Sequence, residues 1–249
     1  MAERIILKQR PNKTVYREGT VVIKEYVPSH PKDAVFSEAY IHSCVESSGL
    51  SIPKILSVVP RDGGWALSME YIEGRTLAQM MEEHPEKAEE YLERLVEIQL
   101  EVGSCRVPRL RNTRSKMAEV IKSMEELDKS TRYELLVRIH GMKQHTKLCH
   151  GDFVPENVII REDGSYCVLD WTHATSGNAG ADAAITYMRF CLSQPEYADE
   201  YLRVFCEKSG MSLNYVQTWM PVVAAVQLSK HKESEEELLS QWIQVAEYQ

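Results

Sequence analysis

The segment 148–171 constrains this 249-residue chain more than any other part of it. It holds HGDFVPEN at 150–157 and LDW at 169–171, and between them two apolar runs, 158–160 and 166–169, joined by a turn at 162–164. This pattern predicts a hairpin with three oxygen-bearing side chains around it, Asp152, Asn157 and Asp170. Mg²⁺ takes such oxygen ligands and keeps waters and phosphates as the others. One carboxylate beyond a metal-holding pair would then remain to accept a proton from a hydroxyl.

The first 72 residues have the pattern of a small sheet. Apolar and β-branched runs at 5–7, 14–16 and 21–23 are separated by turn residues, which predicts a three-stranded antiparallel meander. Pro31 then opens a predicted helix that ends before Gly49. Two further strands, 54–59 and 65–71, are joined by a turn-rich connection. In the third strand Val22, Lys24 and Tyr26 share one face.

After Gly74 the pattern becomes helical. Apolar residues recur at helical spacing over 88–96 and 117–127, and again from 181 to the end. The uncharged stretch 209–229 is long enough to cross a bilayer, but polar residues and Pro221 interrupt it, which favours a buried helix pair. The chain is therefore expected to be α+β.

The pair HGDxxxxN and LDW resembles the catalytic core of the aminoglycoside phosphotransferase-like kinases, a small-molecule branch of the protein-kinase-like fold. The resemblance implies a bilobal chain, with a nucleotide-binding lobe at 1–72 that holds a five-stranded antiparallel sheet and one helix, and a mainly helical catalytic lobe at 73–249. It also implies the roles of the three residues. Asp152 is the catalytic base, and Asn157 and Asp170 bind Mg²⁺ for phosphoryl transfer from ATP or GTP.

The same resemblance assigns residues of the first lobe to the nucleotide. Lys24 matches the lysine that contacts the α- and β-phosphates, and Glu38, fourteen residues later in the helix, matches its ion-pair partner. Glu70, Tyr71 and Ile72 look like the hinge, whose backbone groups would face the purine. Without the order of the motifs, Lys24 would be interpreted as an exposed lysine of a strand. Glu38 would likewise be interpreted as a solvated residue of a helix.

Two further residues match positions that order the catalytic loop. Asp182 resembles an aspartate that braces this loop, so we assign it a structural role. His150 stands beside the catalytic aspartate and could itself be a base. We favour a structural role for His150, because Asp152 already fits the position that faces the hydroxyl.

The chain also departs from related patterns. The expected nucleotide-covering loop, 10–16, contains no glycine, so phosphate contacts there would come from backbone amides or from Lys13. Val154 and Glu156 replace residues that many relatives carry beside the acceptor, so the resemblance does not carry the acceptor's identity over. Sequences of the type GxxxxGK[ST], GxSxG and HExxH do not occur.

Charge suggests what the acceptor is. The net charge is −8, with seven Lys or Arg against three Glu in 1–32, a balance of +4, and hence −12 in 33–249. This favours a cationic acceptor such as an aminoglycoside, attracted by Glu156 and by an acidic run of which some members could line the cleft: Glu233, Glu235, Glu236 and Glu237. Choline, ethanolamine, homoserine and fructosyl-amines remain open, as does a catalytically silent nucleotide-binding homologue. A protein kinase is disfavoured by the missing GxGxxG.

Composition excludes other classes. An acidic body argues against nucleic-acid binding. Six cysteines without a CxxC pair, behind an N-terminus that lacks a signal-peptide pattern, predict reduced thiols in a cytoplasmic protein with no membrane segment. The expected partners are the nucleotide and the small acceptor, in a monomer or weak dimer.

Overall fold

The computed structural model describes residues 3–244, and its chain divides into two compact units. The first unit contains the residues up to Glu83 together with Pro155–Ala174, and the second contains His84–Val154 and the residues from Thr175 on. The expected nucleotide-binding lobe 1–72 and catalytic lobe 73–249 remain a prediction. The two units are defined by how residues pack and not by what they bind. The hairpin that carries Asn157 and Asp170 belongs to the first unit.

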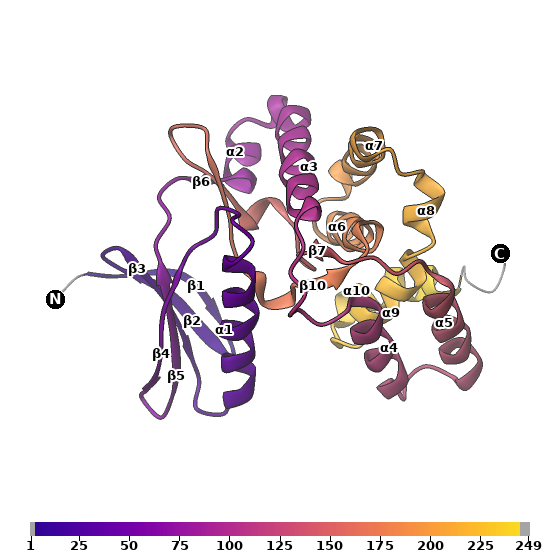
Figure 1. Ribbon diagram of the computed structural model, residues 1–249, viewed down its shortest axis with the longest axis horizontal. Coiled ribbons are helices and arrows are strands. Elements are labelled where there is room, and N and C mark those ends of the chain that lie inside the picture. The colour runs from indigo at the N-terminus through magenta and orange to yellow at the C-terminus, as the bar shows by residue number, and fades with distance from the viewer. Residues whose placement is uncertain (1–2, 245–249) are drawn as a thin grey trace. The chain divides into compact units, whose positions relative to one another are not determined.

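A five-stranded antiparallel sheet with one helix forms most of the first unit, which confirms the expected α+β arrangement (Figure 1). Its strand order is β1-β2-β3-β5-β4. A second, three-stranded sheet has the order β6-β8-β9. The elements of this unit are β1 Arg4–Arg10, β2 Lys13–Glu18, β3 Val21–Tyr26, α1 Lys32–Glu46, β4 Ile55–Arg61, β5 Gly64–Glu70, β6 Arg75–Thr76, α2 Leu77–Glu83, β8 Val158–Ile160 and β9 Tyr166–Val168.

The alternation of β3 decides which side chains meet α1. Tyr26 packs with Val35 of α1 and with Leu67 and Met69 of β5 in one apolar cluster. Ile23 packs in another cluster with Tyr16 and Ala66. Because strand side chains alternate, Lys24 lies on the face that α1 covers. This confirms the shared face expected for Lys24 and Tyr26.

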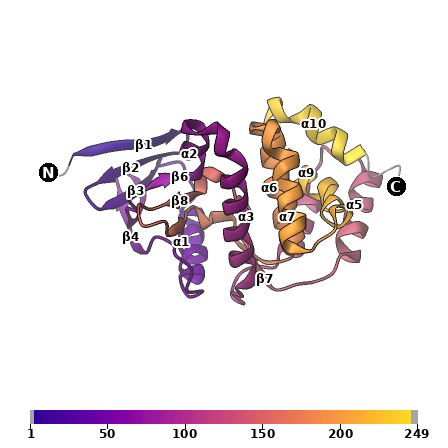
Figure 2. The same ribbon diagram turned by 90° about the horizontal axis from the view of Figure 1, so that it is seen from above.

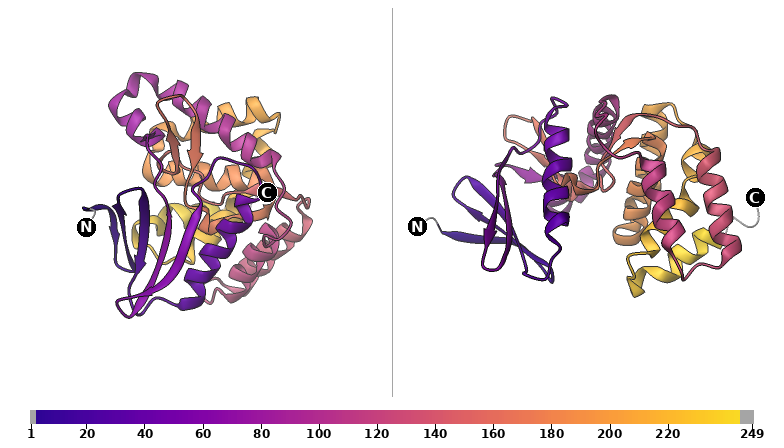
Figure 3. Two further views of the ribbon diagram at one scale, coloured as in Figure 1. Left: turned by 60° about the vertical axis from the view of Figure 1, so that its left-hand side comes forward. Right: turned by 60° about the horizontal axis from the view of Figure 1, so that its bottom comes forward.

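The second unit is mainly helical, with a two-stranded sheet of β7 and β10. Helix α3 packs against α7, and α6 packs against α7 and α9 (Figure 2), while α4 and α5 lie side by side (Figure 3, right). The elements are α3 Ala88–Ser104, α4 Thr113–Ser123, α5 Lys129–Gly141, β7 Lys147–Cys149, β10 Thr175–Gly177, α6 Ala179–Ser193, α7 Ala198–Ser209, α8 Leu213–Gln217, α9 Met220–Leu228 and α10 Glu233–Gln244.

Helix α6 is fixed in this unit by a buried polar network. The Gln99 amide on α3 donates to Thr186 Oγ1 on α6 at 3.2 Å, and the Tyr201 hydroxyl on α7 donates to Gln99 Oε1 at 2.7 Å. Asn178 caps the start of α6 by accepting a hydrogen bond from the Gly180 amide. A buried network in which each member has a partner holds its helices in one register. Residues on α6 therefore have defined positions.

Of the buried helix pair expected around Pro221, α9 is buried, whereas α8 exposes Leu213, Asn214 and Gln217, so this expectation is wrong for α8. Pro221 lies in the first turn of α9. Proline is tolerated there because the first amides of a helix have no intrahelical acceptor. Among residues 3–244, no helix combines the length and the apolar character that a membrane span requires.

Candidate active site

Lys24, Glu38 and Asp170 meet in the first unit. The Lys24 ammonium donates to Glu38 Oε1 at 2.6 Å and to Asp170 Oδ1 at 2.9 Å. The side chains of Lys24 and Glu38 are 9% and 7% exposed, whereas that of Asp170 is 41% exposed. Segments 146 residues apart in the chain are thus joined by one ammonium. Neither Lys24 nor Glu38 is an ordinary surface residue.

The charges of this cluster stabilise one another. Burial by itself would raise the pKa of Glu38, but the ammonium groups of Lys24 and Lys13 and the hydrogen bonds from Lys24 and Tyr26 lower it. Burial opposes the ionisation of Asp170 as well, and Lys24 nevertheless holds the pKa of Asp170 well below its usual range. The pKa of Lys24 is raised, since Asp170 and Glu38 outweigh the effect of burial. All three groups are therefore charged at neutral pH.

Two neighbours extend the cluster. The Tyr26 hydroxyl donates to Glu38 Oε2 at 2.6 Å, so both carboxylate oxygens of Glu38 are bound. The Lys13 ammonium lies 3.9 Å from Glu38 Oε2 and 5.4 Å from the centre of the Tyr26 ring. Lys13 therefore lies in the same cluster as Lys24, as a second cation beside Glu38.

The hairpin of β8 and β9 brings Asn157 and Asp170 to one end of the small sheet. Val158 pairs with Val168, and the Leu169 amide donates to the Asn157 carbonyl at 2.8 Å. Asp170 then adopts a left-handed conformation with φ 57° and ψ 62°, and the Thr172 hydroxyl donates to its Oδ1 at 2.9 Å. Asparagine and aspartate are enriched in this conformation. The Asp170 carboxylate is thus held by both Lys24 and Thr172.

These two residues fit a hard divalent cation held partly by a substrate. Asn157 offers an amide oxygen and Asp170 a partly exposed carboxylate. Mg²⁺ commonly binds through one or two protein oxygens, with substrate phosphates and waters as the other ligands. Within residues 3–244 no group of three or more His, Cys, Asp and Glu side chains could hold a metal ion by itself. Asn157 and Asp170 could therefore hold a Mg²⁺ ion whose other ligands are phosphates and waters.

Two backbone amides of the expected hinge, 70–72, already donate hydrogen bonds within the first unit. The Glu70 amide donates to the Lys54 carbonyl at 3.0 Å, and the Tyr71 amide donates to the Thr20 carbonyl at 2.8 Å. These two amides hold the end of β5 in the sheet, so they cannot also donate to a purine. Contacts of the hinge with a base, if made through 70–72, would use the carbonyls or the Ile72 amide.

In the second unit, Asp152 lies in the loop that follows β7. The Asp152 amide donates to His150 Nδ1 at 3.2 Å, and His150 itself is fully buried against Phe153. The Gly151 amide donates to Asp182 Oδ1 at 2.7 Å. His150 and Asp182 thus fix the loop backbone around Asp152, which agrees with the structural roles expected for both.

Arg189 of α6 contacts Asp152 directly. Its Nε lies 3.2 Å from Asp152 Oδ1, and each of the two side chains is 28% exposed. The contact is an ion pair outside hydrogen-bonding geometry, and the buried Nε makes no hydrogen bond within the described residues. A guanidinium beside the expected base was not predicted from the sequence. The available signal was its position seven residues after Asp182 on one helix.

The residues of the acidic run do not all have the same surroundings. Glu235 accepts hydrogen bonds from Lys232 at 2.8 Å and from Gln227 at 2.6 Å. Glu233, Glu236 and Glu237 are exposed on α10. Their expected role in attracting a cationic acceptor remains a prediction.

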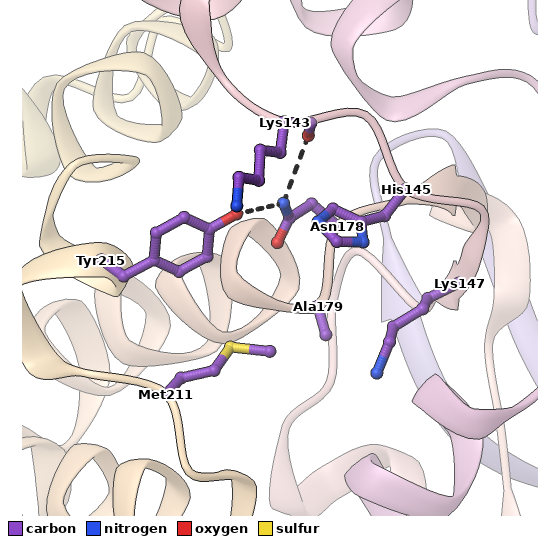
Figure 4. Close-up of a pocket in the computed structure, with 7 residues that line it drawn as sticks. All are labelled: Lys143, His145, Lys147, Asn178, Ala179, Met211 and Tyr215. Atoms are coloured by element: carbon purple, nitrogen blue, oxygen red, sulfur yellow. Dashed lines mark hydrogen bonds between the residues drawn. The ribbon is translucent and has the colours of Figure 1, made fainter.

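A cavity of about 210 Å³ opens in the second unit where α6 begins (Figure 4). The Asn178 amide lies at its centre and donates to the Tyr215 hydroxyl at 2.5 Å and to the Lys143 carbonyl at 3.4 Å. Its lining also includes His145 and Lys147. No residue that the sequence assigned to the reaction lines this cavity, so it is separate from the Asp152 loop.

Comparison with known proteins assigns the family. Residues 4–215 match the model of the phosphotransferase enzyme family known as APH. The chain belongs to this family. The assignment confirms the resemblance found in the catalytic segment. A search of curated proteins finds no match.

Solved structures of aminoglycoside phosphotransferases share the fold. A ternary complex of a thermostable APH(4)-Ia variant with ADP and hygromycin B has 14% identity and a TM-score of 0.70, covering 98% of this chain and 91% of that one. The type VIII aminoglycoside-3'-phosphotransferase has 14% identity and a TM-score of 0.66, with coverage of 90% and 93%. The streptomycin–ATP complex of APH(2'')-IIa has 17% identity and a TM-score of 0.63, with coverage of 97% and 91%. At these identities the likeness establishes the fold of this phosphotransferase.

Proposed function

We propose that this phosphotransferase moves the γ-phosphate of ATP or GTP, in the presence of Mg²⁺, to a hydroxyl group of a small molecule. The observation that carries the proposal is the Lys24 ammonium held between Glu38 and Asp170. A buried lysine fixed by two carboxylates presents a positive charge at a defined point, as binding of nucleotide phosphates requires. Structural neighbours bound to ADP or AMP-PNP support a nucleotide as co-substrate.

In this proposal the residues of the first unit bind the nucleotide. Lys24 contacts the α- and β-phosphates, and Glu38 keeps the ammonium in place. Asn157 and Asp170 hold the Mg²⁺ ion, which would neutralise charge on the phosphates. Lys13, beside Glu38, adds a second positive charge for the phosphates.

Asp152 is the proposed base. Its carboxylate takes the proton of the acceptor hydroxyl while that oxygen bonds to the γ-phosphorus, and the bond from phosphorus to the bridging oxygen of the nucleotide breaks. His150 and Asp182 support this role by fixing the backbone on both sides of Gly151. A catalytically silent homologue is the less favoured proposal, because Lys24, Asp152, Asn157 and Asp170 are all present.

An aminoglycoside is one candidate acceptor. It is supported by the solved neighbours, which include complexes with hygromycin B and streptomycin. Choline, ethanolamine, homoserine and fructosyl-amines are further candidates for the same chemistry. The proposal of phosphoryl transfer to a hydroxyl does not depend on which of them is correct.

A nucleotide-release screen tests the proposal. Purified protein with Mg²⁺ and ATP or GTP is mixed with each candidate acceptor, and release of the nucleoside diphosphate and formation of a phosphate ester are both measured. We expect at least one hydroxyl compound to be phosphorylated by the wild type and not by Asp152→Asn. If Mg²⁺-nucleotide neither raises the melting temperature nor is consumed with any acceptor, the proposed function is wrong.

A further inference from the structure

Arg189 brings a positive charge to the place where the acceptor hydroxyl must lie. Under the proposed function, Asp152 touches that hydroxyl, and the Arg189 Nε lies 3.2 Å from Asp152 Oδ1. More than a quarter of the Arg189 side chain is exposed. A planar guanidinium has five N–H donors, so contact with one carboxylate oxygen leaves it able to bind a second anion.

Two lysines of the same unit extend this positive charge. Lys230, which follows α9, is exposed and interacts electrostatically with both Asp152 and Arg189. Lys116 of α4 is half-buried and interacts with Lys230. Burial and the neighbouring cations Lys230 and Arg111 lower the pKa of Lys116. Helix α9 packs against both α4, which carries Lys116, and α6, which carries Arg189, and Lys230 lies in the turn after α9.

The nearby carboxylates do not cancel this charge. The charged groups that act on Lys230 include Asp152 and Glu235 as anions, and Arg189 and Lys232 as cations. Glu235 is engaged by Lys232 at 2.8 Å. Asp152 then stands against Arg189 and Lys230, and Lys116 interacts electrostatically with Lys230. We call Arg189, Lys230 and Lys116 the basic cluster.

We infer that the acceptor carries an anionic group, a phosphate or a carboxylate, near the hydroxyl that is phosphorylated, and that the basic cluster binds this group. The inference rests on the proposed function and narrows its substrate class. Guanidinium and ammonium groups bind phosphates and carboxylates by charge-assisted hydrogen bonds. A polycationic acceptor would instead meet the like charges of Arg189 and Lys230 beside Asp152. The overall charge of −8 therefore misrepresents the local charge around the expected base.

A matched set of acceptors tests the inference. One series is glucose, glucosamine, glucuronate and glucose 6-phosphate, and another is glycerol, serinol, glycerate and glycerol 3-phosphate, with hygromycin B as the polycation. Initial rates are measured with Mg²⁺-ATP, and melting temperatures are measured with Mg²⁺-AMP-PNP bound. We expect the anionic members of at least one series to exceed the neutral parent about tenfold in kcat/KM and to give a larger rise in melting temperature. The phosphate and carboxylate members distinguish the two anions.

Substitutions test whether Lys230 and Arg189 bind the anionic group of the acceptor. Lys230→Gln and Arg189→Gln should each raise the KM for the anionic acceptor by about 10- to 100-fold, the range for a lost charged hydrogen bond. In Lys230→Gln the KM for the anionic acceptor should rise by a larger factor than the KM for the neutral parent. Arg189→Gln should also alter kcat, because Arg189 adjoins Asp152. Arg203→Gln on α7 is the control. Arg203 is an exposed arginine that pairs with Glu200 and Glu207, and its loss should change neither constant.

The outcomes separate this inference from the proposed function. If hygromycin B or the amino members are preferred in rate and in melting temperature, the basic cluster does not select an anion, although phosphoryl transfer stands. Equal KM values for anionic and neutral acceptors in the wild type and in both variants also overturn the inference. If no acceptor is phosphorylated, the melting temperatures alone test the inference. Equal rises in melting temperature with the anionic and the neutral members then overturn the inference.

Discussion

Asp182 and Arg189 lie seven residues apart on α6 and contact two consecutive residues of one loop. Asp182 Oδ1 accepts a hydrogen bond from the Gly151 amide at 2.7 Å, and Arg189 Nε lies 3.2 Å from Asp152 Oδ1. Seven residues are close to two helical turns, so both side chains leave the same face of α6. One helix face thus fixes both the backbone and the charge environment of the proposed base.

Replacing the base with its amide tests the role of Asp152. Asp152→Asn keeps the size of the side chain but cannot accept the hydroxyl proton, so kcat should fall by about 10²–10⁴-fold. Affinity for AMP-PNP should hardly change, because the proposed nucleotide-binding residues Lys24 and Glu38 belong to the other unit. Steady-state kinetics and calorimetric titration measure the two quantities. Asp199→Asn, an exposed aspartate of α7, is the control. Activity of Asp152→Asn within a few-fold of wild type would remove Asp152 from this role.

The metal assignment is tested best with Asp170→Asn. Asparagine tolerates the left-handed conformation of this position, which alanine does not, so the change removes a charge with little backbone strain. Affinity for AMP-PNP is measured in Mg²⁺ and in EDTA. The gain in affinity that Mg²⁺ gives should shrink by about tenfold or more in the variant, since a charged ligand to the ion is lost. An unchanged Mg²⁺ effect would show that Asp170 does not hold the ion.

Much of the fold was predictable because it depends on local patterns. The five strands of the large sheet, α1 and the hairpin 158–168 follow from β-branched runs, turn residues and alternation, and their boundaries moved by only a few residues. The strand order β1-β2-β3-β5-β4 was not predicted, because it depends on pairing between β3 and β5, from Val21 with Glu70 to Tyr26 with Trp65, which are far apart in the chain. The strands β6, β7 and β10 are two or three residues long and carry no periodic signal.

The candidate site was likewise predictable only in part. Lys24, Glu38, Asn157 and Asp170 came from motif order, and the structure brings Lys24 to both Glu38 and Asp170. Arg189 was missed because its partner lies in a separate segment of the chain. The amides of Glu70 and Tyr71 are bound within the sheet, and a pattern of residue types cannot reveal how backbone groups are used. Net charge averages over the whole surface, so it cannot reveal a local charge such as that of Arg189, 3.2 Å from Asp152 Oδ1.

Unfolding measurements test the energetic role of Lys24. Lys24→Met leaves Glu38, 7% exposed, without its main countercharge, and breaking a buried ion pair in this way costs about 3–5 kcal/mol. Adding Glu38→Leu removes the stranded charge, so the double variant should be more stable than the sum of the two single losses predicts. Lys54→Met, at an exposed position, is the matched control. Strict additivity in urea unfolding would mean that the two residues do not stabilise each other.

The pH dependence of stability should depend on His42. His42 is 2% exposed, and its Nε2 donates to the Pro53 carbonyl at 2.6 Å. Burial lowers the pKa of His42, and the Pro53 carbonyl and Glu46 only partly oppose this. Above about pH 6.5, the value for an unfolded chain, the ring is neutral in both states and contributes no pH dependence.

Below about pH 6.5 the unfolded chain binds a proton at His42 that the folded chain does not, so the free energy of unfolding falls as pH falls. The slope contributed by this one group reaches at most about 1.4 kcal/mol per pH unit and levels off below the lowered folded pKa. His42→Gln keeps a donor for the Pro53 carbonyl but does not titrate, so its stability should vary less between pH 7 and pH 5. Urea unfolding across this range measures the difference. His84→Gln, at an exposed position, should keep the wild-type slope. Equal slopes for wild type and His42→Gln would show that another group causes the acid sensitivity.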